Sequence, residues 1–277
     1  MYSQIYRCPL CQSLLQTQDK YWRCEQGHCF DVARQGYVNL LPVQQKKSKQ
    51  PGDSKEMVEA RYQFLSSGVY QPIADAVWQA LLTWIPDECA GILDAGCGEG
   101  YYLNALNNQL IDNNPVLVGL DIAKPAVHKA AVLYKQPQWI VGSNRGLPLI
   151  DACLDAVICM FGFPCFDEFA RVLKPAGVVV MVDPAEQHLI ELRRLIYPDI
   201  KQKPAVDPSV WEKAGLVSIT DTVLKYQQPG LSKQQLHNLM LMTPHFFRAP
   251  QGAREKIEQL DTLDVTVNAC IRVLQKA

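Results

Sequence analysis

Residues 91–101 read Gly91-Ile92-Leu93-Asp94-Ala95-Gly96-Cys97-Gly98-Glu99-Gly100-Tyr101, an apolar strand that runs into a glycine-rich turn. A helical stretch through Leu110 follows, and further strands alternate with helical stretches along the chain. The predicted strands are Val116–Ile122, Gln138–Val141, Leu154–Met160 and Gly177–Val182, and the predicted helices among them are Lys124–Tyr134 and Phe166–Leu173. This alternation predicts a doubly wound parallel sheet with its ligand at the carboxyl ends of the strands, near the glycine turn.

The spacing of the glycines indicates which ligand the turn binds. A dinucleotide-binding turn has the pattern G-x-G-x-x-G, which from Gly96 requires a third glycine where Tyr101 stands. The turn instead reads D-x-G-x-G-x-G, which resembles the pattern of class I methyltransferases that use S-adenosylmethionine (SAM). In those enzymes the glycines let backbone amides approach the amino-acid end of the cofactor. The predicted cofactor-binding residues of the turn are Asp94, Gly96, Gly98, Glu99 and Gly100.

Two later residues complete the predicted SAM site. Asp121 ends the next strand, where a carboxylate accepts hydrogen bonds from both ribose hydroxyls, and Asn144 follows the third strand, where it would read the adenine edge. The strand-like stretches Val217–Gln227 and Val265–Leu274 match the hairpin that ends a methyltransferase sheet. The predicted fold is therefore α/β, a class I SAM-dependent methyltransferase with a Rossmann-like, seven-stranded sheet, over residues 71–277.

Residues near the start have the spacing of a metal site. The pattern C-x2-C-x12-C-x3-H is formed by Cys8, Cys11, Cys24 and His28. Two such pairs on neighbouring turns can close a tetrahedron around one zinc ion per chain. Because so short a segment buries too little apolar surface to fold alone, the zinc would be structural. Cys29 stands next to His28, which leaves an all-cysteine site open. We expect a zinc-binding module over residues 1–35.

Composition and charge limit the kinds of protein that this chain can be. The chain is 48% hydrophobic with a formal net charge of −1, and no apolar run approaches the roughly eighteen residues of a membrane span. The first residues lack the pattern of an export signal, so a cytoplasmic protein without a membrane partner is expected. A basic excess centres on residues 44–50, as either a solvated loop or a polyanion contact. Residues 36–70 are expected to form a basic linker and connecting helix (Glu56–Leu65), and a further helix is predicted over Pro72–Trp84.

The zinc module combined with this SAM domain resembles the bacterial 23S rRNA (guanine-N1)-methyltransferase family. The resemblance covers nearly the whole chain and is carried by Gly27-His28-Cys29-Phe30-Asp31, Gly36-Tyr37-Val38-Asn39-Leu40-Leu41, Pro51-Gly52-Asp53-Ser54, Gly98-Glu99-Gly100-Tyr101-Tyr102, Pro164-Cys165, His188-Leu189, Leu195-Ile196-Tyr197 and Met242-Thr243-Pro244. It implies a homodimer that methylates guanine N1 in the helix 35 hairpin of 23S rRNA, at the 745-type target of the Gram-negative branch rather than the 748-type target. It also implies that Tyr70 and His188 lie near the cofactor, although the residues alone suggest a packing residue and a solvated helix residue.

Methylation of the guanine N1 atom needs the nucleobase to be oriented toward the methyl group, and it needs a route by which the N1 proton can leave. The base must first leave its stack, and the loop Phe161-Gly162-Phe163-Pro164-Cys165 is expected to hold it, with Phe161 or Phe163 either stacking on guanine or serving in the core. The candidate general bases are Asp183 and His188, with backbone carbonyls and water as the alternative. Two rival functions stay open: a SAM enzyme for a small molecule, whose zinc module serves structure or dimerisation, and an RNA-binding protein with an inert methyltransferase domain.

Overall fold

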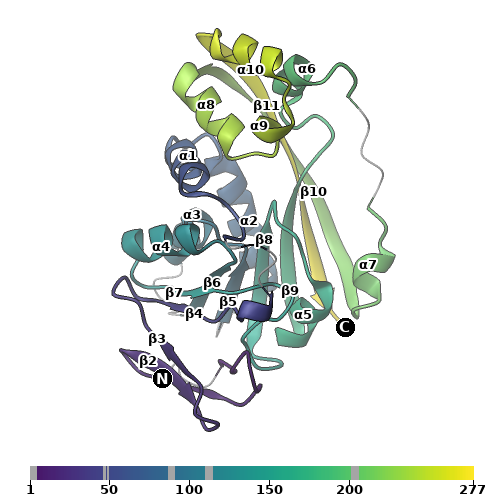
Figure 1. The fold of residues 1–277 in the computed structure, drawn as a ribbon. Helices are drawn as coiled ribbons and strands as arrows, with labels where there is room; N and C mark the ends of the chain where they lie inside the picture. Colours follow the sequence, from purple (N-terminus) through teal and green to yellow (C-terminus); the bar gives the residue numbers. More distant parts are fainter. Residues whose placement is uncertain (1–4, 46–47, 49, 87–90, 110–114, 201–205) are drawn as a thin grey trace.

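One large sheet fixes where a ligand can bind. In the computed structural model, which describes residues 5–45, 48, 50–86, 91–109, 115–200 and 206–277, eight strands form this sheet. In chain order they are β4 (Tyr37–Asn39), β5 (Gly91–Ala95), β6 (Val116–Asp121), β7 (Gln138–Val141), β8 (Leu154–Met160), β9 (Leu173–Pro184), β10 (Leu216–Ser232) and β11 (Thr262–Lys276). Their order across the sheet is β10-β11-β9-β8-β5-β6-β7-β4 (Figure 1).

The strand order confirms the methyltransferase fold. Strands β5 to β9 are parallel, and β11 lies antiparallel between β9 and β10. These strands and β10 are the predicted seven, although β9, β10 and β11 extend beyond their predicted ends. β4 adds an eighth, parallel to β7 at the sheet edge. It comes from residues 36–70, so part of the segment expected as a linker is a strand of the main sheet.

Helices cover the sheet and one of its ends. They are α1 (Lys55–Ser66), α2 (Gln71–Trp84), α3 (Tyr101–Asn107), α4 (Lys124–Leu133), α5 (Phe166–Val172), α6 (Ile190–Ile196), α7 (Ser209–Glu212), α8 (Lys233–Leu241), α9 (His245–Arg248) and α10 (Gln251–Glu258), with a 3-10 turn, η1 (Val43–Gln45). Helices α1 to α5 were predicted, although Leu110 lies outside the described residues. Helices α8 to α10 connect β10 to β11, and α8 packs against α1 (Figure 1).

The front module is a small antiparallel sheet. Its strands β1 (Leu15–Thr17), β2 (Tyr21–Cys24) and β3 (Cys29–Asp31) pair in the order β1-β2-β3. The module lies below the β4 edge in the view of Figure 1. Its strands are too short to enclose a core of their own, so the module depends on the metal site and on the larger domain.

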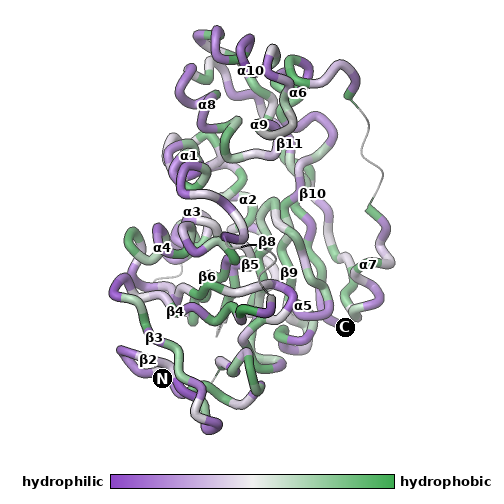
Figure 2. The backbone as a smooth tube through the Cα atoms, in the orientation of Figure 1, coloured by the Kyte–Doolittle hydropathy of each residue, from purple (hydrophilic) through white to green (hydrophobic). Residues whose placement is uncertain are grey.

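Each face of the large sheet has its own core. Ile92 and Ile158 point to the face covered by α2, α3 and α4. Leu93 and Val157 point to the other face, where the same apolar cluster contains α5, α7 and Trp22 of the front module. This division follows from the alternation of side chains along a strand. The central strands are accordingly coloured mainly as hydrophobic in Figure 2, and the front module completes the second layer.

Two further expectations concern membrane-spanning helices and the basic segment around residues 44–50. None of the described helices has the length and apolar character that a membrane crossing requires. Lys46, Lys47 and Lys49 of the basic segment lie outside the described residues.

Candidate metal centre and cofactor site

The four predicted metal ligands come together in the front module. The Sγ atoms of Cys8 and Cys24 lie 3.5 and 3.4 Å from His28 Nδ1, and the Sγ atoms of Cys11 and Cys24 lie 3.6 Å apart. All four ligand atoms lie within 4.8 Å of one another. A tetrahedron with Zn–S bonds of about 2.3 Å has edges of roughly 3.8 Å. The residues therefore fit zinc, and three thiolates with one imidazole leave no position for an activated water.

Cys29 is placed differently from its neighbour His28. It lies on β3 opposite Arg23, is exposed, and is not part of the metal-ligand cluster found among the described residues. The Cys11 Sγ atom lies in hydrogen-bond contact with the Ser13 hydroxyl, at 3.0 Å. Together with the Ser13 backbone, this contact lowers the pKa of Cys11 to about 7.

The glycine turn after β5 brings bare backbone to the surface of a cavity at Gly96 and Gly98, whereas the predicted cofactor residue Gly100 does not line the cavity. Gly96, Gly98 and Gly100 have φ angles of +98°, +56° and +88°, in the left-handed region. At Gly100 a side chain would also collide, because a Cβ atom there would lie 2.5 Å from the Trp139 ring. Glycine is therefore required at this position both for conformation and for space.

Asp121 is held at the end of β6 by the same turn. Its Oδ2 accepts a hydrogen bond from the Gly98 N–H at 3.0 Å, and its Oδ1 accepts one from the Ala123 N–H at 2.7 Å. A carboxylate offers about four acceptor positions, so capacity is left for a ligand. Asp121 lines the cavity, which fits the predicted acceptor of ribose hydroxyls.

Two further carboxylates of the turn are buried. Asp94 and Glu99 are each 1% exposed. Both oxygens of Asp94 and Oε2 of Glu99 lack a hydrogen-bond partner in the described part of the chain. Burial, with repulsion from Asp121 and Glu99, raises the pKa of Asp94 to about 8; burial raises the pKa of Glu99 to about 7 against the opposing effect of Arg61. Buried acceptors without donors indicate a missing ligand. Glu99 lines the cavity, where the ammonium and sulfonium charges of SAM fit its carboxylate, whereas the predicted cofactor residue Asp94 is not among the residues that line the cavity.

The cavity over the turn has a volume of about 920 Å³. This value is at the upper end of the range for ligand pockets, which leaves room for a substrate beside a cofactor. Besides the turn and Asp121, its walls include Tyr70, Asn144, Phe161, Phe163, His188, Tyr197 and the stretch Met242-Thr243-Pro244-His245. Residues that carry the family resemblance thus meet at one cavity although they are far apart in the sequence.

Tyr70 and His188 are in contact at this cavity. The Tyr70 hydroxyl lies 3.2 Å from His188 Nε2, and the Asn268 N–H donates to His188 Nδ1 at 3.2 Å. Because a backbone N–H only donates, neutral His188 carries its proton on Nε2 and donates it to Tyr70. Both ring nitrogens are thus engaged. The geometry favours His188 as a residue that orients Tyr70 and speaks against the predicted general base.

Asn144 joins the loop after β7 to the loop after β8. Its Nδ2 donates to the Phe163 carbonyl at 3.2 Å and to the Ala95 carbonyl at 3.4 Å. Its Oδ1 is buried and has no partner among the described residues. A buried amide oxygen facing a cavity fits a hydrogen-bond donor on the ligand, such as an exocyclic amine.

Asp183 does not line the cavity. It pairs with Cys270 in the β9–β11 ladder, and its charge acts on Cys159 and Arg272. The next residue, Pro184, lines the cavity instead. Successive side chains of a strand point to opposite faces, so the predicted role of Asp183 as general base has no support in the geometry.

Sequence reasoning missed a partly buried ion pair at the cavity wall. Arg61 of α1 pairs with Asp53 at 2.5 Å, and its guanidinium lies 3.6 Å from the position of a Cβ on Gly98. Burial opposes its charge, but the attraction of Asp53, Glu99 and Asp121 raises the pKa of Arg61 overall. A cation beside the turn fits the carboxylate of the SAM amino-acid end. The stretch Pro51-Gly52-Asp53-Ser54 was the available signal. The Tyr197–His245 contact of 2.9 Å was also missed.

Binding of SAM is expected to release protons. The folded pKa values of Asp94 and Glu99, about 8 and about 7, lie above their ordinary values of 3.8 and 4.5. Raised carboxyl pKa values stabilise the free protein at low pH, and this contribution is lost as pH rises toward about 8. A cationic ligand favours the ionised carboxylates, so its affinity should increase from pH 6 to 8.5. Calorimetry at pH 7.5 in two buffers of different ionisation enthalpy measures the released protons.

Glu99→Gln supplies the comparison for this experiment. The variant keeps the size of the side chain but has no proton to release, so its proton release should be smaller than that of the wild type. The ionisation of SAM itself is common to both proteins and cancels in the difference. Equal proton release by the two proteins would contradict the assignment of Glu99.

Comparisons with known proteins agree with this geometry. Residues 6–49 match the family described as "RlmA, N-terminal", and residues 93–181 match the methyltransferase domain family. YxjB of Bacillus subtilis (strain 168), whose name places it among the 23S rRNA (guanine-N(1)-)-methyltransferases, is 32% identical over 98% of this chain and 97% of its own length. A Micromonospora griseorubida protein named for the same activity is 33% identical over 85% of this chain and 81% of its own.

A third relative has a named target. The 23S rRNA (guanine(748)-N(1))-methyltransferase of Streptomyces fradiae is 37% identical over 67% of this chain and 65% of its own length. The zinc ribbon and the methyltransferase domain establish zinc and SAM as the cofactors. Since two of these relatives exceed 30% identity across most of their length, the chain belongs to the 23S rRNA (guanine-N1)-methyltransferase family.

Proposed function

We propose that this protein methylates N1 of a guanine in the helix 35 hairpin of 23S rRNA, at the 745-type target, and acts as a homodimer. The observation that carries the reaction is the near full-length similarity to relatives named for guanine-N1 methylation. Two of the stretches that carry the family resemblance, Pro51–Ser54 and Met242–Pro244, contribute residues to the cavity wall. One relative is named for position 748, so the experiment must compare both positions.

The lining of the cavity supports the proposal that a nucleobase binds there beside SAM. Phe163 lines it and is 91% exposed, so most of its ring surface is accessible to a ligand. Phe161 instead packs against Tyr70 and His188, with ring centroids 6.0 and 5.8 Å apart. Of the two predicted stacking residues, Phe163 is therefore the one placed to receive a base that has left its stack.

Orientation supplies most of the catalysis in this proposal. SAM provides an activated methyl group when bound, so the protein must align guanine N1 with it and exclude competing poses. The Tyr70–His188 pair and the Asn144 amide position the cavity wall beside the glycine turn. The domain boundaries 1–35, 36–70 and 71–277 stay part of the proposal, except that Tyr37–Asn39 of the middle segment forms strand β4 of the main sheet. The front module and the basic segment contact the hairpin in this proposal.

The proposal is tested by locating N1-methylguanine in rRNA. An N1 methyl group blocks Watson–Crick pairing, so reverse transcription stops beside it. We expect a stop at the 745-type position of rRNA from the wild-type strain, its loss on deletion of the gene, and its return on complementation. A stop at the 748-type position would overturn the finer assignment, and no change at any 23S guanine would favour a small-molecule substrate.

Phe163→Ala should impair use of RNA without affecting the cofactor. Loss of one stacked base costs about 1–3 kcal/mol, so kcat/KM for a hairpin transcript should fall by roughly 5- to 150-fold. SAM affinity, measured by calorimetry, should not change. Phe163→Trp, which keeps the stacking surface, is the matched control and should retain activity. Equal activity of the Ala and Trp variants would show that Phe163 does not hold the base.

A further inference from the structure

The front module docks onto the large domain along one short segment. The Arg7 N–H donates to the Pro148 carbonyl at 3.1 Å, and the Ile150 N–H donates to the Ile5 carbonyl at 2.8 Å. Tyr6 and Leu149, which pair between these bonds, are both fully buried. The Tyr6 ring also lies 4.5 Å, centroid to centroid, from that of Trp22 of the module. The module thus adds a strand-like edge to residues 148–150.

The same segment leads directly to the cofactor cavity. Ser143, Asn144 and Arg145 line the cavity, and Leu149 follows Arg145 after three intervening residues. A tight turn joins the two parts, since the Gly146 N–H donates to the Ser143 carbonyl at 3.1 Å and the Arg145 N–H donates to Ser143 Oγ at 3.2 Å. Residues 143–150, the cofactor loop, therefore contact the cavity at one end and the zinc module at the other.

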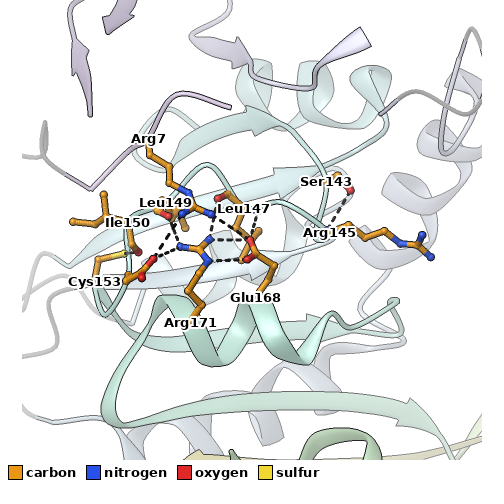
Figure 3. Close-up of polar contacts among 10 residues, drawn as sticks. Arg7, Ser143, Arg145, Leu147, Leu149, Ile150, Cys153, Glu168 and Arg171 are labelled. Atoms are coloured by element: carbon orange, nitrogen blue, oxygen red, sulfur yellow. Dashed lines mark hydrogen bonds and ion pairs between the residues drawn. The ribbon is translucent and has the colours of Figure 1, made fainter. Parts of the chain in front are cut away.

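Arg171 of α5 holds this loop from the opposite side. Its guanidinium donates to the carbonyls of Leu147 and Leu149 at 3.1 and 2.7 Å. It also pairs with Glu168 and Asp151, each at 2.7 Å (Figure 3). Because one planar group satisfies two carbonyls and two carboxylates, the loop backbone has little freedom here.

Glu168 and Arg7 complete the arrangement. Glu168 Oε2 accepts the Leu147 N–H at 2.7 Å. The Arg7 guanidinium lies 3.9 Å from Glu168 and 3.7 Å from Asp151, so a residue of the front module joins the same charge network (Figure 3). The cofactor loop is thus fixed between a helix of the methyltransferase domain and the metal-dependent module.

We propose that Arg171 is a positioning residue for SAM, and that through it and Arg7 the zinc module holds the cofactor loop in its binding conformation. Zinc and SAM then bind to one coupled unit: each ligand stabilises the loop arrangement that the other requires. Such coupling is reciprocal, so each ligand must raise the affinity of the other by the same factor. The inference concerns the cofactor and is independent of which base is methylated.

Substitution of Arg171 tests the first half of the proposal. Arg171→Ala should weaken SAM binding by about 5- to 150-fold, the usual range of such couplings, as measured by calorimetry on the zinc-loaded protein. Arg171→Lys restores the charge but not the planar set of donors, and should recover only part of the affinity. Arg272→Ala is the matched control, because Arg272 forms a comparable pair with Asp221 at 2.8 Å away from the loop. It should leave SAM affinity unchanged.

Zinc release tests the coupling itself and separates positioning from general stability. In the wild type, saturating SAM should slow transfer of zinc to a chromogenic chelator, and in Arg7→Ala this protection should largely disappear even where the melting temperature is retained. Arg7→Ala also serves if Arg171→Ala fails to fold, because the ion pairs of Arg7, at 3.7 and 3.9 Å, are longer than those of Arg171, at 2.7 Å. Zinc release that is insensitive to SAM in the wild type, or SAM affinity in the Arg7 and Arg171 variants equal to that of Arg272→Ala, would overturn the proposal.

Discussion

Replacing Cys24 with Ala is expected to remove zinc and unfold the front module. Structural zinc sites contribute about 10–16 kcal/mol of apparent binding free energy at neutral pH, and the strands of the module have too little core to fold without it. Since Trp22 belongs to the same apolar cluster as the large sheet, the melting temperature of the whole protein should also fall. Elemental analysis and thermal unfolding measure both effects, from one zinc per chain in the wild type to almost none in the variant.

Cys29→Ala is the matched control for the loss of zinc. Cys29 is the same residue type on the same small sheet, but it is exposed and lies outside the ligand cluster. It should keep its zinc, whereas His28→Ala should lose it. The reverse pattern would establish the all-cysteine site, and less than about half a zinc per chain in wild type purified without chelators would eliminate the site.

The central part of the fold was predictable because its signals are local. β8 is buried along its whole length, as expected of a parallel strand covered on both faces, and such strands read as unbroken apolar runs. β4 gave no comparable signal: it has three residues between Gly36 and Pro42 and owes its pairing to β7, which is distant in the sequence. Helix α8 carries a readable local signal, the capping box of Ser232 and Gln235.

In the candidate site, too, some residues were predictable from local motifs, whereas others depend on contacts between distant parts of the chain. The glycine turn and the metal ligands are sequence motifs, and their arrangement follows from spacing. One partner of His188 is the Asn268 backbone N–H, and the packing of β11 beside β9 brings these two residues together. Asp183 is a candidate base by its residue type and by its place after the fifth strand. Which face of β9 it occupies depends on register, and there Pro184 takes the position at the cavity.

Gly100→Ala is expected to destabilise the protein by about 2–5 kcal/mol. A left-handed conformation costs a residue with a Cβ roughly 1–2 kcal/mol, and overpacking of a dense core typically adds about 1–3 kcal/mol. Both costs apply at Gly100. Its φ angle is +88°, and a Cβ atom there would lie 2.5 Å from Trp139 and 3.1 Å from Ala130 and Tyr134. Urea unfolding measures the change, which is a large share of the roughly 5–15 kcal/mol that stabilises a domain.

Gly68→Ala separates the two contributions. Gly68 has nearly the same backbone angle, +80°, but nothing within 4 Å of a Cβ, so its substitution should cost only the roughly 1–2 kcal/mol of the conformation. The excess loss in Gly100→Ala then measures the collision with Trp139. Trp139→Phe removes the part of the ring that a Cβ on Gly100 would meet, so the double variant should be more stable than the sum of the single effects predicts. Strict additivity would mean that the turn, rather than the ring packed against it, requires glycine at this position.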